Sequence, residues 1–171
     1  MRIISGKFKG TKLFIPSDKD IRPLKDLARE SILNVLLHSK KIQFELKNAK
    51  ILDLYSGTGS FGLECLSREA ANVTFVENNK NALKILLKNI DKIKIKKKTY
   101  IEDYSVFIYL LSAKNFDDKI DLIFLDPPYE EKNISTLIKN IDEIKILKKN
   151  GIIIIHRKKN RWIIIQTVLK F

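Results

Sequence analysis

The chain has 171 residues, of which 44% are apolar, enough for one domain with a hydrophobic core. Its single cysteine excludes an intramolecular disulfide and a cysteine-based metal cluster, and with only two histidines we expect no metal site. The formal net charge of +13 favours a polyanionic partner such as nucleic acid, although 27 lysines against 6 arginines is a bias that genome composition alone can produce.

The amino-terminal segment predicts a small hairpin that carries candidate RNA-binding residues. It has no apolar stretch of signal-peptide length, and no run in the chain is long enough to span a membrane, so we expect a cytoplasmic protein without membrane contacts. Two short strands, residues 2–5 and 11–15, are expected around a turn with two glycines. In one interpretation, the lysines of this turn bind RNA phosphates and Phe8 stacks on a base. In the other, Phe8 covers the core and the lysines prevent an edge strand from pairing with another chain. The hairpin candidates for RNA binding are Lys7, Phe8, Lys9 and Lys12.

A helix is expected next, beginning at Arg22 and Pro23, because proline is favoured in the first turn of a helix. Apolar residues recur at helical spacing and give this helix one apolar face. Arg22 and Arg29 lie on the other side and are the remaining candidates for RNA contact, although packing alone also explains a helix this amphipathic. We therefore divide one compact unit into an RNA-contacting extension, residues 1–40, and a main domain, residues 41–171.

A glycine-rich loop follows the first strand predicted for the main domain, residues 51–54. Gly57, Gly59 and Gly62 fit the pattern G-x-G-x-x-G, which lets a ligand approach the backbone at a helix N-terminus. The second predicted strand, residues 72–76, ends at Glu77, 20 residues after Gly57, where a carboxylate reaches ribose hydroxyls. Together the loop and the acid predict a cofactor that contains a nucleoside.

Asp53 distinguishes between the two common cofactors of such a loop. It lies at the end of the first predicted strand, four residues before Gly57. A carboxylate there would oppose the negative charges of the pyrophosphate in NAD, whereas it would pair with the ammonium of a methionyl group. The sequence therefore favours S-adenosylmethionine.

The third predicted strand, residues 99–101, ends beside two further candidate cofactor-binding residues. Asp103 is positioned to accept a hydrogen bond from the adenine amino group, and Tyr104 to flank the ring. Before this strand, residues 79–90 predict a helix with one apolar face, and the lysine-rich residues 92–98 a solvated loop or strand edge.

The stretch D-L-I-F-L-D-P-P-Y, residues 121–129, predicts a short buried strand that Asp126 and two prolines stop abruptly. The prolines stiffen the loop and leave carbonyls free, so Asp126 and a proline carbonyl can accept both hydrogens of an exocyclic amine on a base. Accepting them localises the nitrogen lone pair that the ring otherwise withdraws. Tyr129 adds a ring face on which a purine stacks. The candidate catalytic residues are Asp126, Pro127 and Tyr129.

The remaining pattern completes an α/β fold. Helices are expected at residues 106–112 and 133–141, a turn at Asn150-Gly151, and strands at residues 152–155 and 162–171. His156 is interpreted as a strand-end residue, because no acid or nucleophile stands beside it in the sequence. Strands alternate with helices and the ligand loops follow strand ends, so we expect an open Rossmann-like sheet with helices on both faces, preceded by the hairpin and its helix.

Four segments together resemble the RsmD family, bacterial 16S rRNA guanine-N2 methyltransferases with the class I methyltransferase fold. They are M-R-I-I-S-G-K-F-K-G-T-K-L at the amino terminus, R-P-L-K-D-L-A-R-E-S-I-L-N-V-L over residues 22–36, D-L-Y-S-G-T-G-S-F-G-L-E over residues 53–64, and D-P-P-Y at residues 126–129. The resemblance covers residues 1–155 and implies methyl transfer to the exocyclic amine of one guanine in 16S rRNA within a small-subunit assembly particle. We expect a monomer.

The resemblance implies a role for each matched residue. The methionyl end would contact Asp53, Gly57 and Gly59, the ribose Glu77, the adenine Asp103, and the guanine Asp126 and Tyr129. The chain departs from the family pattern at Leu24 and Leu27, where threonine and arginine are common, and at His156, where a glutamate is frequent.

Three other functions remain open on the sequence. A DNA adenine-N6 methyltransferase uses a similar loop but generally needs an added target-recognition region, for which the chain has little room. An NAD-dependent oxidoreductase would leave Asp53 and the Asp126 loop unexplained. A non-catalytic RNA-binding relative of the methyltransferases would not need intact cofactor and substrate motifs.

Overall fold

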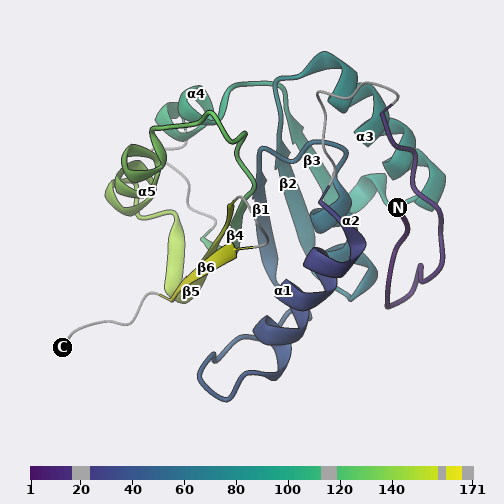
Figure 1. Cartoon of the computed structure of the whole chain (residues 1–171), viewed down its shortest axis with the longest axis horizontal. Coiled ribbons are helices and arrows are strands. Elements are labelled where there is room, and N and C mark those ends of the chain that lie inside the picture. The colour runs from purple at the N-terminus through teal and green to yellow at the C-terminus, as the bar shows by residue number, and fades with distance from the viewer. Residues whose placement is uncertain (17–23, 113–118, 158–160, 167–171) are drawn as a thin grey trace.

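Six strands form one sheet at the centre of the molecule (Figure 1), in a computed structural model that describes residues 1–16, 24–112, 119–157 and 161–166. The strand order is β3-β2-β1-β4-β5-β6, and the first five strands are parallel while β6 runs antiparallel to β5. The predicted open α/β sheet is confirmed. The strands are β1 Lys50–Leu54, β2 Asn72–Val76, β3 Thr99–Glu102, β4 Ile120–Leu125, β5 Leu147–Arg157 and β6 Arg161–Gln166.

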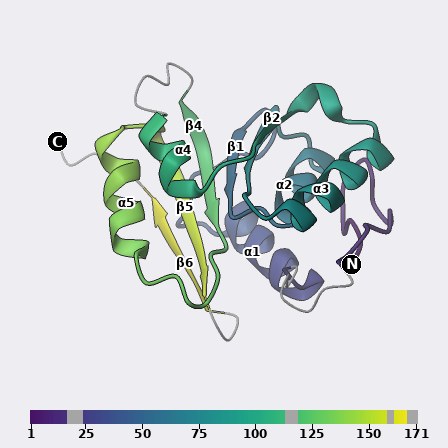
Figure 2. The ribbon, with the colours of Figure 1, turned by 90° about the horizontal axis from the view of Figure 1, so that it is seen from above.

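Helices cover both faces of the sheet, as Figures 1 and 2 show. Side chains alternate between the faces of a strand, so Ile51 joins the core under α1, α2 and α3, whereas Leu52 joins the core under α4 and α5. Among the described residues, no helix is long and apolar enough to cross a membrane. The helices are α1 Asp26–His38, α2 Ser60–Ser67, α3 Lys80–Ile93, α4 Val106–Ser112 and α5 Ile134–Glu143, with a short 3₁₀ turn, η1, at Lys96–Lys98.

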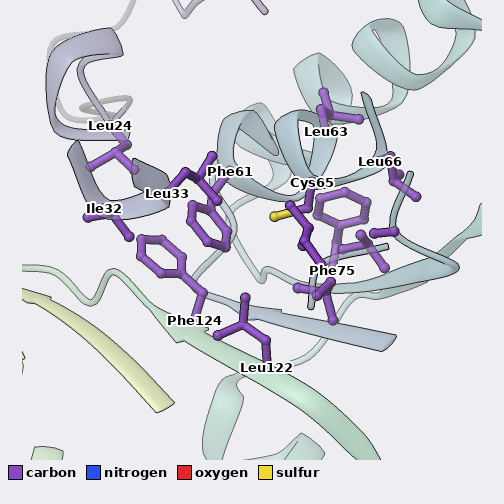
Figure 3. Close-up of a cluster of buried hydrophobic side chains, with 14 of the residues drawn as sticks. Leu24, Ile32, Leu33, Phe61, Leu63, Cys65, Leu66, Phe75, Leu122 and Phe124 are labelled. Atoms are coloured by element: carbon purple, nitrogen blue, oxygen red, sulfur yellow. The ribbon is translucent and has the colours of Figure 1, made fainter. Parts of the chain in front are cut away.

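An aromatic stack in the larger core fixes two of the loops at the carboxyl edge of the sheet. The rings of Phe61 and Phe124 stack with centroids 3.8 Å apart and planes 13° from parallel, beneath Leu33 of α1 (Figure 3). Phe61 follows the glycine loop, and Phe124 precedes Asp126 by two residues. Since such a pair contributes about 0.5 to 1.5 kcal/mol beyond its buried area, the core itself holds these two loops in register.

The first 16 residues, the N-terminal arm, do not form the two predicted strands. One isolated bridge joins Arg2 and Lys12, and the chain turns through Gly6 and Gly10, which have φ angles of 82° and 85°. Backbone hydrogen bonds also cross between the two segments, from the N–H of Ile3 to the Thr11 carbonyl at 3.0 Å and from the N–H of Leu13 to the Met1 carbonyl at 3.2 Å. The two segments therefore lie antiparallel around the predicted turn, but they do not form the regular strands expected at residues 2–5 and 11–15.

Side chains of α2 and α3 form hydrogen bonds with the backbone of the arm. On α2, Glu64 accepts hydrogen bonds from the backbone N–H groups of Ile4, at 2.7 Å, and Ser5, at 2.9 Å. On α3, Asn89 accepts from the N–H of Phe14 at 2.7 Å and donates to the carbonyl of Thr58 in the glycine loop at 3.1 Å. The buried Asn89 side chain thus joins the arm to the loop that follows β1.

Three predicted elements differ from the structure by several residues. The strand expected over residues 162–171 is described as Arg161–Gln166, and residues 167–171 lie outside the described residues. The helix expected from Arg22 begins at Asp26, and residues 17–23 lie outside the described residues. The turn expected at Asn150-Gly151 lies within β5, where the pairing passes from Ile120 with Leu147 to Leu122 with Ile152. The positive φ of Asn150, 62°, is used by this irregularity rather than by a reversal of the chain.

Candidate functional site

Five parallel strands end at the same level and bring their following residues into one row. Leu54 of β1 pairs with Val76 of β2 and Leu125 of β4, and the register continues outward to Glu102 and Ile155. The strand order reverses between β1 and β4, which is where open α/β sheets bind ligands. The residues in this row are, in strand order, Asp103, Glu77, Tyr55, Asp126 and His156.

The loop between β1 and α2 has the shape of a ligand cradle. Gly57 and Gly59 have φ angles of 55° and 79°, a region that suits glycine. A Cβ on Gly59 would lie 2.3 Å from a Leu86 methyl carbon, whereas a Cβ on Gly57 would meet nothing within 4 Å. The hydroxyl oxygens of Ser56 and Thr58 are buried without a hydrogen-bond partner among the described residues. Buried hydroxyls normally have partners, so this loop fits a polar ligand.

Asp53 lies beneath this loop and is almost completely buried. Its Oδ2 accepts a hydrogen bond from the N–H of Gly62 at 3.0 Å. Burial raises the pKa of Asp53 well above its usual value, and the nearby carboxylates of Asp126 and Glu77 raise it further. Three carboxylates gathered here favour a cationic ligand group, which would stabilise the ionised form of Asp53.

Glu77 connects two loops at the end of β2. Its Oε2 accepts from the N–H of Gly57 at 2.8 Å, and its Oε1 accepts from the N–H of Asn79, also at 2.8 Å. Each carboxylate oxygen can accept a further hydrogen bond, so the predicted ribose contact remains chemically open to it. The sequence spacing predicted Glu77 as a ligand residue, but it did not predict that Glu77 stabilises the glycine loop by a hydrogen bond to Gly57.

Asp103 and Tyr104 are both exposed at the end of β3. Asp103 forms an ion pair with Lys80 of α3, a contact that local sequence spacing does not predict. The pair lies at the surface, where water competes with it, so the carboxylate remains able to accept from another donor. The expected adenine contact stays a prediction.

The loop after β4 presents a carboxylate, a free carbonyl and an aromatic ring. The carbonyl of Pro128 accepts from the N–H of Glu131 at 3.0 Å, whereas the buried Pro127 has a carbonyl that accepts from none of the described residues. The side chain of Asp126 is 25% exposed and that of Tyr129 lies at the surface. Of the two proline carbonyls, that of Pro127 is therefore the one left for a ligand.

His156, interpreted from the sequence as a strand-end residue, lies directly against Asp126. Its Nδ1 is 2.8 Å from Asp126 Oδ1, and its Nε2 is buried without a partner among the described residues. The two residues are 30 apart in sequence, so local spacing does not reveal the contact. Aligning the apolar ends of β4 and β5, Leu125 and Ile155, would have predicted it.

The arm presents its lysines but not its phenylalanine. Lys7, Lys9 and Lys12 are exposed. Phe8 is half-buried and packs against the larger core, and the Lys7 ammonium lies 5.8 Å from the centre of its ring. Of the two interpretations of Phe8, the one in which it covers the core is therefore confirmed.

Arg29 is not available to RNA, and its assignment as an RNA-binding residue is wrong. The side chain is fully buried on α1, where it pairs with Asp26 at 3.0 Å and lies 3.7 Å from Glu64. It also donates a hydrogen bond to the Arg2 carbonyl of the arm. Helical spacing alone did not reveal that the arm covers this side of the helix. Arg22, the other candidate on this segment, lies outside the described residues.

Comparisons with known proteins agree on one family. The family model described as conserved hypothetical protein 95 matches residues 1–170. The chain is 34% identical to the ribosomal RNA small subunit methyltransferase D of Buchnera aphidicola from Acyrthosiphon pisum, with 95% of this chain and 81% of that protein covered. It is 30% identical to the protein of the same name from Haemophilus influenzae, over 96% of this chain and 82% of that one. The crystal structure of a candidate methylase from Haemophilus influenzae superposes with a TM-score of 0.74 at 26% identity, covering 98% of both chains.

Proposed function

The chain belongs to the family described as conserved hypothetical protein 95, the RsmD family of small-subunit rRNA methyltransferases, and on this premise we propose that it methylates the exocyclic N2 of a guanine in 16S rRNA. It is an S-adenosylmethionine-dependent enzyme. The observation that supports the proposal most directly is the carboxylate of Asp126, which lies at the reversal point of the sheet among the acidic residues that suit a cationic methyl donor.

The residues at the ends of β1 and β2 fit S-adenosylmethionine. When bound, this cofactor supplies a methyl group on a positively charged sulfonium, which is an excellent leaving group. Asp53 would face the methionyl ammonium, and the unpartnered hydroxyls of Ser56 and Thr58 suit its polar groups. Gly57 leaves open space beside them. Glu77 would hold the ribose, and at the end of β3 Asp103 and Tyr104 would receive the adenine.

The loop after β4 suits the amine of the guanine. Asp126 Oδ2 and the Pro127 carbonyl can each accept one amine hydrogen, because neither accepts a bond from the described residues. Tyr129 offers a ring for the base, a stacking interaction of roughly 1 to 3 kcal/mol. Alignment of the amine with the methyl group and acceptance of one proton are sufficient, so the chemistry needs no covalent enzyme intermediate.

The arm is proposed to bind the RNA backbone. Lys7, Lys9 and Lys12 are exposed on a segment held by α2 and α3, and residues 1–40 would form the RNA-contacting extension of the domain, residues 41–171. We propose as substrate a small-subunit assembly particle, met in the cytoplasm by a monomer of this chain. The affinity should fall with salt, with a log-log slope of about 0.7 to 0.9 per phosphate neutralised.

The test is methyl transfer from labelled S-adenosylmethionine to small-subunit particles that lack the modification, followed by mapping of the labelled base. Label on the N2 of one guanine is expected. Asp126→Ala should remove nearly all methyl transfer and leave only a small residual rate, while the affinity for S-adenosylhomocysteine stays within about twofold, because cofactor binding and stabilisation of the transition state can be lost separately. Equal loss of both would assign Asp126 a structural role and refute the proposed chemistry.

A further inference from the structure

The contact between His156 and Asp126 has a defined direction. The Nδ1 and Oδ1 atoms are 2.8 Å apart, a distance that requires a hydrogen between them. An ionised carboxylate has no hydrogen to give, so Nδ1 carries it and donates. His156 therefore holds one of the two oxygens of Asp126, while Oδ2 makes no hydrogen bond with the described part of the chain.

The other ring nitrogen argues against a packing role for His156. Its side chain is 11% exposed, and Nε2 is buried without a partner within the described residues. A buried unpaired nitrogen costs free energy, and an apolar side chain at this position would avoid that cost. The hydrogen bond from Nδ1 to Asp126 therefore explains the presence of a histidine at this position better than packing of its ring does.

The surrounding charges leave His156 as the group that orients Asp126. No lysine or arginine in the described ranges forms an ion pair with Asp126. Arg157, the next residue of β5, points its guanidinium at the carbonyl of Glu131, 3.4 Å away, and Tyr55 donates to the Glu131 carboxylate at 3.3 Å. The nearby Asp53 carboxylate repels Asp126 rather than fixing it.

We propose that His156 is a positioning residue for methyl transfer, whose ring fixes the Asp126 carboxylate so that Oδ2 accepts a hydrogen of the target amine. This inference rests on the proposed function. The N–C bond forms as the C–S bond breaks, with the electron pair of that bond remaining on sulfur. The amine proton passes to Asp126 Oδ2, and the electrons of the broken N–H bond stay on nitrogen. The imidazole keeps its proton and acts only through Asp126.

Asparagine and leucine are matched replacements for His156. They have nearly the same shape, and the asparagine Nδ2 takes the place of the imidazole Nδ1, whereas leucine has no donor there. In the particle assay, His156→Asn should keep kcat within about threefold of wild type, and His156→Leu should lower it by roughly 10- to 150-fold, the range of one lost charge-assisted hydrogen bond. KM for the particles and Kd for S-adenosylhomocysteine should stay within about twofold in both.

Two further measurements separate positioning from folding. If His156→Leu melts well below wild type, His156→Gln replaces it, since glutamine keeps an amide but sets it beyond Asp126 Oδ1. In an Asp126→Ala background, adding His156→Leu should change the residual rate by less than about twofold, as expected for residues that act as one unit.

Three results would overturn the inference. They are an unchanged rate in His156→Leu, an equal loss in the asparagine and leucine variants, and a further loss in the Asp126→Ala background. With an active wild-type protein, any of these leaves the proposed function standing. A wild-type protein that transfers no methyl group to the particles would instead overturn the proposed function and the inference together.

Discussion

Replacing Asp53 by asparagine should change stability and ligand affinity in opposite directions. Asparagine has the same shape and keeps an oxygen for the N–H of Gly62, which lies 3.0 Å from Asp53 Oδ2, but it removes the buried charge. Because burial raises the pKa of Asp53, the folded protein binds its proton more tightly than the unfolded chain does. The free energy of unfolding of the wild type therefore falls as the pH rises from about 4, the pKa of an unfolded aspartate, through the folded-state pKa.

The variant lacks this fall, so at pH 7 and without ligand Asp53→Asn should be more stable than wild type, while at pH 4 the two should be similar. For a chain of this size each kcal/mol gained raises the melting temperature by about 2 to 4 °C. The affinity for S-adenosylhomocysteine should decrease, because the methionyl ammonium would meet an amide instead of a carboxylate. A lost charged hydrogen bond of about 1.5 to 3 kcal/mol predicts a loss of roughly 10- to 150-fold.

Thermal melting across this pH range and titration calorimetry measure the two effects. Asp121→Asn is the matched control, since Asp121 accepts from Lys148 and from the N–H of Lys50 at the opposite end of the sheet. This variant should leave ligand affinity unchanged. A variant Asp53→Asn that is less stable than wild type at pH 7, or that binds S-adenosylhomocysteine as tightly, would refute the reasoning.

The other predictions concern the arm, the glycine loop and the stacking residue. Glu64→Gln removes the buried partner of an arginine and should lower the free energy of unfolding by about 3 to 5 kcal/mol, whereas Glu69→Gln, in a surface pair, should lower it by less than about 1 kcal/mol in the same denaturant titration. Gly59→Ala forces a Cβ into a core methyl group and should therefore destabilise the fold. Gly57→Ala should fold, at a cost of about 1 to 2 kcal/mol for its positive φ, but should bind S-adenosylhomocysteine weakly. Equal melting temperatures of these two variants would contradict this reasoning. Tyr129→Phe should retain methyl transfer and Tyr129→Ala should lose roughly 5- to 150-fold in kcat/KM, and indistinguishable rates would exclude stacking.

Local pattern was sufficient for most of the sheet and for the residues at strand ends. Asp53, Glu77 and Asp126 could be placed from the sequence because each follows an apolar run, and parallel strands deliver their carboxyl ends to one edge. The strand order that puts β1 beside β4 is likewise a property of this fold class.

Contacts between distant segments could not be read from local pattern. His156 meets Asp126 because of the register between β4 and β5, and Arg29 is buried because the arm crosses its helix. An aromatic residue among lysines, such as Phe8, can either bind a base or cover the core, and local pattern does not distinguish the two. The structure shows that Phe8 packs against the core. The Asn150-Gly151 pair carries a turn signal, yet the neighbouring strands absorb it as an irregularity within β5. In each case the deciding partner lies far away in the sequence.

Asn89 links the proposed RNA-binding arm to the glycine loop by hydrogen bonds to Phe14 and to Thr58. An arm already ordered in the free enzyme spares an incoming ribosomal particle the entropy of ordering it, so association should follow a single step without a folding phase. These hydrogen bonds of Asn89 also mean that a particle that displaces the arm would loosen the glycine loop, which is proposed to hold the methyl donor. A bound donor that orders the glycine loop would, in turn, order the arm. Binding of the particle and binding of the methyl donor would then change each other's affinity by equal factors.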